Sequence, residues 1–238
     1  MKGFLLISNQ DRYFHAMLLD KEFGTVENFT MGSSFAFKAR KGNDPDTPTF
    51  NEAMPGPHRE QFIKAMYKEI KTLEKLKTWN VIQKSDVPTD QKVIPSTWAF
   101  KIKRYPDGRL RKFKARFCVR GDRQEEGVDY FESYAPVVSW ATVRMLMRIA
   151  IKEGWKSRQV DFQNAFAQAP IREEVYINMP PMFGDSTKNT VMKLNKSLYG
   201  LLQAPLTWYD HLKKELERLG FEPLERDQCL FYRKYMIS

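Results

Sequence analysis

The chain has 238 residues, and its 42% hydrophobic and 13% aromatic content is sufficient for a packed core and argues against disorder. Lys and Arg number 39 against 29 Asp and Glu, and the resulting formal charge of +10 predicts a polyanionic partner where the basic residues cluster. No run of eighteen apolar residues is present, and the apolar stretch Phe4–Ile7 is short for a signal peptide. We therefore expect an intracellular protein without a membrane-spanning segment.

Cysteine and histidine are few and far apart in the sequence. Cys118 and Cys229 form neither a metal-binding spacing nor a disulfide framework. His15, His58 and His211 stand beside no obvious partner. These patterns argue against a zinc site and against a Cys/His nucleophile.

Hydrophobic spacing predicts where order begins and where the helices lie. The first forty residues show short apolar runs without a sustained period, and Lys41–Pro48 is rich in turn-forming residues, so we expect the ordered domain to begin after it. Apolar residues recur every three or four positions in Pro57–Leu76, Ser139–Gly154 and Pro205–Gly220. We predict three amphipathic helices that pack on a core, the second with Ser139 as its N-cap.

The segment Thr97–Arg120 predicts a β-hairpin, because Tyr105–Gly108 has turn chemistry and its flanks alternate with a period of two. The apolar face carries Trp98, Phe100, Ile102, Phe113, Ala115, Phe117 and Val119. The opposite face carries Lys101, Lys103, Lys112, Lys114, Arg116 and Arg120. Nine Lys and Arg stand against one Asp between positions 101 and 120, whereas a merely solvated face would mix both signs. We interpret the cationic face as a surface that contacts phosphates.

Asp161 is a lone carboxylate between Val160 and Phe162, in what we expect to be a short, partly buried strand. A buried carboxylate requires compensation by an arginine, by hydrogen bonds or by a metal ion. A surface aspartate at the end of a strand is the alternative. The segment by itself does not decide between them.

A series of short segments carries a family resemblance over roughly residues 60 to 238. They are Thr78–Asn80, Trp98–Lys103, Pro106–Gly108, Lys114–Arg116, Tyr134–Val138, Gln159–Asp161, Asn164–Phe166, Leu198–Leu201, Gln203–Pro205 and Trp208–Tyr209. In order and spacing they resemble the reverse transcriptases of Ty1/copia-type retrotransposons.

The resemblance implies an α+β fold, a partial right-hand polymerase with fingers and an incomplete palm. Residues 1–55 would be a linker or extension that precedes the polymerase in a polyprotein, and residues 56–238 would form the polymerase. Within the latter, the fingers would occupy mainly residues 60–150 and the entry to the palm residues 155–238. The function expected is RNA-directed DNA polymerisation, in the cytoplasm within a virus-like particle or in the nucleus.

The same resemblance assigns the metal and triphosphate ligands. Asp161 matches the catalytic aspartate that binds two Mg²⁺ ions, with the backbone carbonyl of Phe162 as a further ligand. Lys103, Lys114 and Arg116 become the candidates for contact with the triphosphate of an incoming deoxynucleotide. Which of these three reaches the phosphates stays open. The RNA template and the DNA primer are the other expected partners.

Four further residues are assigned by resemblance to the sugar and the nascent base pair. Phe166, five residues after Asp161, matches an aromatic gate that excludes a ribose 2′-hydroxyl, with core packing as the alternative role. Gly200 would allow a close approach of the backbone to the nucleotide, and either Tyr199 or Gln203 would make a polar or stacking contact.

One departure from the family pattern concerns the C-terminal end. In the family a Tyr-X-Asp-Asp box follows the segment that matches Asp227–Phe231, and the printed sequence reaches Ser238 without it. The thumb, ribonuclease H and integrase of the polyprotein are also absent from these residues. We therefore expect the fragment by itself to be inactive, unless another chain supplies the missing carboxylates. The alternative is a non-catalytic remnant that binds nucleic acid.

Overall fold

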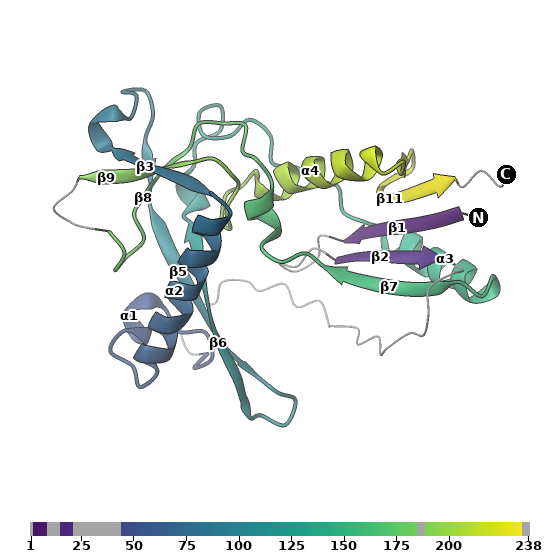
Figure 1. Ribbon diagram of the computed structural model, residues 1–238, viewed down its shortest axis with the longest axis horizontal. Coiled ribbons are helices and arrows are strands. Elements are labelled where there is room, and N and C mark those ends of the chain that lie inside the picture. The colour runs from purple at the N-terminus through teal and green to yellow at the C-terminus, as the bar shows by residue number, and fades with distance from the viewer. Residues whose placement is uncertain (1, 9–14, 21–43, 185–188, 235–238) are drawn as a thin grey trace. The chain divides into compact units, whose positions relative to one another are not determined.

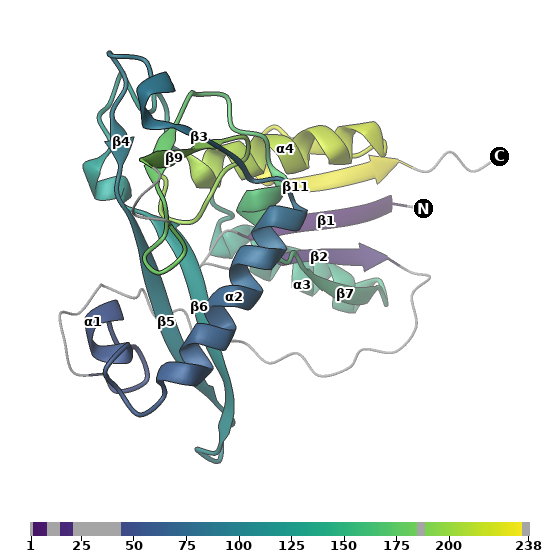
Figure 2. The same ribbon diagram turned by 60° about the vertical axis from the view of Figure 1, so that its left-hand side comes forward.

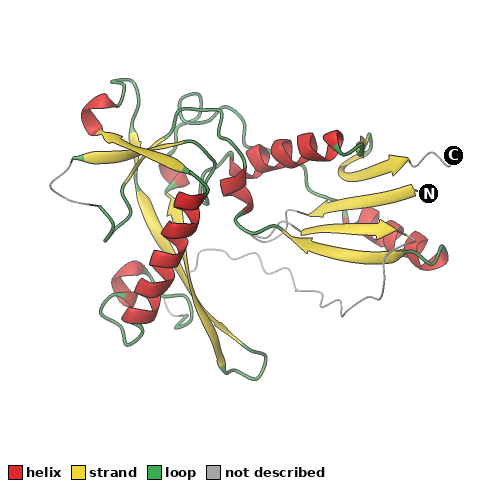
Figure 3. Ribbon diagram, viewed as in Figure 1, coloured by secondary structure: helices red, strands yellow, loops and turns green. Residues whose placement is uncertain are grey.

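The computed structural model describes residues 2–8, 15–20, 44–184 and 189–234, and it is a mixed α/β structure (Figures 1 and 3). It divides into two compact units. Unit 1 takes in the described residues of Met1–Ala39, Tyr134–Ala165 and Trp208–Ser238. Unit 2 takes in those of Arg40–Ser133 and Phe166–Thr207.

Unit 1 is built on a five-stranded sheet in the order β10-β11-β1-β2-β7. Its strands are β1 (Lys2–Ser8), β2 (His15–Asp20), β7 (Lys156–Asp161), β10 (Glu222–Leu224) and β11 (Asp227–Lys234). All neighbouring pairs are antiparallel. Helix α3 (Trp140–Lys152) belongs to the same unit, and α4 (Ala204–Arg218) enters it at Trp208.

The expectation of a linker over residues 1–55 requires correction. Strand β1 pairs with β11 on one side and with β2 on the other, and β2 also pairs with β7. The apolar run Phe4–Ile7 has no alternation because a strand with neighbours on both edges in the middle of a sheet can be apolar on both faces. Order therefore does not begin only after Pro48.

Unit 2 contains a second sheet and the predicted hairpin. The four-stranded sheet has the order β3-β9-β8-β4, formed by β3 (Trp79–Gln83), β9 (Thr190–Leu194), β8 (Tyr176–Asn178) and β4 (Val93–Ile94). The hairpin consists of β5 (Ser96–Arg104) and β6 (Leu110–Val119). Helices α1 (Phe50–Ala53) and α2 (Arg59–Lys75) and the 3₁₀ turns Lys84–Asp86 and Gly121–Arg123 complete the unit. A further 3₁₀ turn, Ala165–Gln168, begins at the last residue of unit 1.

The three predicted helices are confirmed as α2, α3 and α4. Ser139 caps α3, since its hydroxyl accepts a hydrogen bond from the backbone nitrogen of Thr142 at 3.0 Å. Gly154 and Gly220 follow α3 and α4 with positive φ angles of 66° and 81°, as expected at helix ends. Among the described residues, none of the helices combines the length and the apolar character needed to cross a bilayer.

Aromatic packing on the apolar face of the hairpin organises unit 2. Phe62 on α2 lies between two hairpin rings, with centroid distances of 4.7 Å to Phe100 and 5.1 Å to Phe113. Trp98 packs against both Phe100 and Phe117, and Phe117 is fully buried. Figure 2 shows α2 lying along β5 and β6. The predicted apolar face of the hairpin is therefore confirmed as core.

We expect Phe62→Ala to destabilise the protein by about 3–5 kcal/mol, because it removes the ring that fills the space between α2 and the hairpin. Urea denaturation followed by circular dichroism measures the loss. Lys68→Ala, at an exposed position on the same helix, is the control and should change stability by less than about 0.5 kcal/mol. Equal effects of the two substitutions would contradict this packing.

Candidate functional site

The cationic face of the hairpin is formed by opposed lysines. Lys101 lies directly opposite Lys114, and Lys103 lies opposite Lys112, while Arg116 is opposite Ala99. Like charges in register across two strands are destabilising. Their presence in two successive pairs is therefore better explained by an anionic ligand than by stability.

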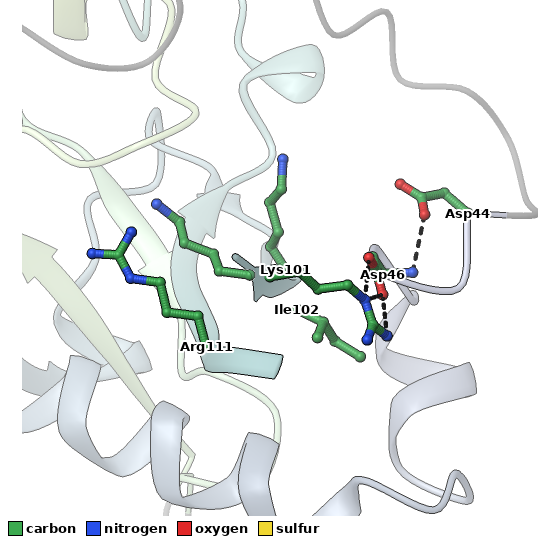
Figure 4. A pocket seen from close by; sticks show the side chains of 7 residues that line it. Asp44, Asp46, Lys101, Ile102 and Arg111 are labelled. Carbon is green, nitrogen blue, oxygen red and sulfur yellow. Dashed lines mark hydrogen bonds and ion pairs between the residues drawn. The ribbon is translucent and has the colours of Figure 1, made fainter. Parts of the chain in front are cut away.

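The tip of the hairpin has charge pairing that the sequence analysis did not anticipate. Asp46 binds the guanidinium of Arg104, with oxygen to nitrogen distances of 2.9 Å to both Nε and Nη2. This hydrogen bonding holds the pKa of the Asp46 carboxyl below its usual value. Asp46 and Arg104 line an open pocket together with Asp44, Lys101, Ile102, Lys103 and Arg111, which Figure 4 shows in part.

Arg120 departs from the predicted cationic face. Strand β6 ends at Val119, and Arg120 stands at the start of the following 3₁₀ turn. Its guanidinium nitrogens donate to both carboxylate oxygens of Asp122 at 2.7 Å, which lowers the pKa of that carboxyl. The two charges compensate each other locally, so Arg120 adds less to the positive potential than the sequence suggests.

Three of the predicted nucleotide-contacting residues lie together in unit 2. The guanidinium carbon of Arg116 stands 4.9 Å from the centre of the Tyr199 ring, in the range of a cation–π contact. The Tyr199 ring meets Phe166 edge to face, at a centroid distance of 5.0 Å and an interplanar angle of 80°. Segments more than eighty residues apart in the sequence thus form one small cluster of a cation and two rings.

The structure separates the roles of Tyr199 and Gln203. The Gln203 side chain is buried, donates to the backbone carbonyl of Asp129 at 3.0 Å and accepts from Gln124 at 3.0 Å. Its amide is therefore used inside the protein. Tyr199 is only half-buried and touches Arg116, so Tyr199 is the better placed of the two for a ligand contact.

Gly200 has a structural reason to be glycine. Its φ is +94°, and a Cβ atom at this position would lie 2.1 Å from the carbonyl oxygen of Val119. The neighbouring carbonyl of Tyr199 accepts a hydrogen bond from the Val119 nitrogen at 2.8 Å. The close approach seen here is to the end of β6, so a second approach to a nucleotide stays a prediction.

Asp161 belongs to unit 1, where it is the last residue of β7 and is exposed. The expectation of a partly buried strand was wrong here, since Val160 is also exposed, and the alternative of a surface aspartate at a strand end is the one observed. Phe162 packs its ring against Trp208 at 5.2 Å. An exposed position lets the carboxylate reach solvent ions without a desolvation penalty.

The fit of these residues to magnesium is partial. A carboxylate at an exposed strand end is a suitable hard ligand for Mg²⁺. Within residues 44–184, 189–234 and the two N-terminal strands, however, no three His, Cys, Asp or Glu side chains are grouped so that they could hold a metal ion. Asp161 can contribute one ligand, and the described residues do not complete a two-ion site.

Comparison with known proteins identifies the family. A model described as reverse transcriptase (RNA-dependent DNA polymerase) matches residues 76–237, more than half of the chain. The chain belongs to this reverse transcriptase family. No solved structure matches it.

Curated relatives place this reverse transcriptase domain in the Ty1/copia type. It is 30% identical over 194 residues to the retrovirus-related Pol polyprotein from transposon TNT 1-94 of Nicotiana tabacum, and 36% identical over 173 residues to that from transposon RE1 of Arabidopsis thaliana. It is 33% identical over 176 residues to the transposon Ty1-DR4 Gag-Pol polyprotein of Saccharomyces cerevisiae. These matches cover 81%, 72% and 73% of the chain but only 14%, 12% and 10% of the relatives.

We expect Gly200→Ala to cost about 3 kcal/mol or more, because it adds a clash with the Val119 backbone to the strain of a left-handed alanine. Gly108→Ala is the matched control, since Gly108 has a φ of +83° and a Cβ atom there would meet nothing within 4 Å. The control should lose only about 1 kcal/mol. Chemical denaturation of both variants gives the comparison, and similar losses would show that the approach to Val119 can relax.

Proposed function

We propose that this chain supplies the fingers and the entry to the palm of an RNA-directed DNA polymerase, as a partial right hand. Unit 2 is assigned to the fingers and unit 1 to the palm. The observation that carries the proposal is the pair of opposed lysines in register on the hairpin, in a chain whose family copies RNA into DNA. Like the relatives that it matches, the chain would work as part of a Pol polyprotein, with an RNA template and a DNA primer as partners.

The proposed reaction is transfer of a nucleotide from a deoxynucleoside triphosphate to the 3′-hydroxyl of a primer. Two bound Mg²⁺ ions would lower the pKa of that hydroxyl and neutralise charge on the leaving pyrophosphate. Asp161 would provide one carboxylate ligand and Phe162 a backbone carbonyl. The remaining carboxylates would come from the Tyr-X-Asp-Asp box that the family places after the residues described here.

The proposed nucleotide contacts follow from the cluster in unit 2. Arg116, Lys114 and Lys103 would bind the triphosphate, because the hairpin places their cationic groups on the face opposite the core. Phe166 would discriminate against ribose sterically, while Tyr199 would support the base pair. Contact with the Tyr199 ring limits the freedom of Arg116, so less conformational entropy is lost when a phosphate binds.

A second candidate is binding of nucleic acid without catalysis. The observation that favours it is that the opposed lysines and Arg116 all lie within unit 2, so the cationic face requires no carboxylate from unit 1. Primer extension distinguishes the two candidates, since only the polymerase incorporates nucleotides.

For the 238-residue chain we expect weak, sequence-independent binding to single-stranded DNA or to an RNA–DNA hybrid that falls steeply with salt. Lys114→Ala with Arg116→Ala should lower the affinity and reduce the salt slope by about one for each phosphate that the protein no longer neutralises. Fluorescence anisotropy across a salt series measures both quantities, with circular dichroism as the folding control. A folded double variant with unchanged affinity and slope would show that the face is only solvated.

In a longer chain that includes the family's Tyr-X-Asp-Asp box and thumb, we expect magnesium-dependent extension of a primer on an RNA template. Asp161→Asn in that protein should abolish extension, because the amide keeps the shape but loses the charge that binds the ions. Template binding is the control and should persist. Near-normal turnover of the Asn variant would remove Asp161 from the metal site.

A further inference from the structure

Glu69 is a carboxylate at the open edge of the cationic hairpin. It lies on α2, which packs against β6, and it is half-buried. Its carboxylate accepts a hydrogen bond from the backbone nitrogen of Phe117. Its Oε1 atom is buried and has no hydrogen-bond partner among the described residues. Only part of the hydrogen-bonding capacity of this carboxylate is therefore satisfied.

The charges nearest to Glu69 are two of the predicted phosphate ligands. Burial raises the pKa of the Glu69 carboxyl, and the positive charges of Lys114 and Arg116 act in the opposite direction. Both cations project from β6 next to Phe117, whose backbone Glu69 binds. Arg116 also contacts the Tyr199 ring, so a negative charge and an aromatic ring act on one guanidinium.

A purely structural role would be to satisfy the free edge of β6. That role requires a hydrogen-bond acceptor, and a glutamine would supply one without a charge. A half-buried carboxylate is costly, and its electrostatic interaction with nearby cations is screened less than that of exposed groups. The charge itself therefore has a consequence for any anion that binds Lys114 and Arg116.

We propose that Glu69 is a positioning residue that holds Lys114 and Arg116 at the edge of the hairpin and competes with bound phosphate for them. The inference rests on the proposed phosphate-binding function of the cationic face. In the absence of a ligand, the carboxylate offsets part of the repulsion between neighbouring cations. When phosphate binds, the same carboxylate opposes it, so the affinity is kept below the limit that the cations alone would reach.

The test compares neutral variants of the 238-residue chain by their affinity for single-stranded DNA. Glu69→Gln should bind about three- to tenfold more tightly than the unchanged protein, because it removes the competing charge and keeps an acceptor for Phe117. Glu74→Gln, at an exposed position on the same helix, makes the same change in net charge and should have little effect. Glu69→Met, similar in volume and neutral, provides a second variant if the glutamine does not fold.

A double-mutant cycle ties the effect to its partners. In a background with Lys114→Ala and Arg116→Ala, the Glu69→Gln effect should disappear. Unchanged or weaker binding by folded Glu69 variants, or an effect that persists in that background, would overturn the role of Glu69. If the double alanine variant alone had unchanged affinity, the phosphate-binding function would fail and this inference with it. If it bound more weakly and Glu69→Gln had no effect, only the inference would fail.

Discussion

Burial of Phe117 fixes the direction of the side chain beside it. Because successive residues of a strand point to opposite faces, the register that places Phe117 in the aromatic core also places Arg116 on the cationic face. A slip of one residue would bury the cations and expose the rings, so the core determines the register strongly. Phe62 on α2 strengthens this constraint because it packs against rings of both strands. The candidate triphosphate ligands are therefore positioned by the hydrophobic core of unit 2.

The other half of the cluster depends on an approach between two backbones. Gly200 and Gly121 both come closer to the neighbouring backbone than a Cβ atom would allow, at the point where β6 ends. This approach lets the Tyr199 carbonyl bind the Val119 nitrogen. The ring of Tyr199 is thereby held beside Arg116, three residues before Val119 on the same hairpin. A cation and a ring from distant parts of the sequence meet because two glycines remove the steric obstacle between their backbones.

Periodic patterns made the helices and the two faces of the hairpin predictable, since each residue there has its role set by near neighbours. Strand β1 was missed because its apolar run lacks a period and its partner β11 lies more than two hundred residues further along the chain. The exposure of Asp161 was missed for the same reason, because burial depends on what packs on a strand. The pairing of Asp46 with Arg104, 58 residues apart, and the internal bonds of Gln203 likewise depend on tertiary contacts that spacing does not encode.

The arrangement of carboxylates around the hairpin bears on its function. Asp46 compensates Arg104 near the tip, Asp122 compensates Arg120 beyond β6, and Glu69 stands at the open edge near Phe117. The opposed pairs of Lys101 with Lys114 and Lys103 with Lys112 lie between these carboxylates along the strands. A sequence optimised for stability alone would place opposite charges in register there. Retaining two like-charged pairs in this stretch costs stability, and a site for a polyanion is the physical reason that accounts for the cost.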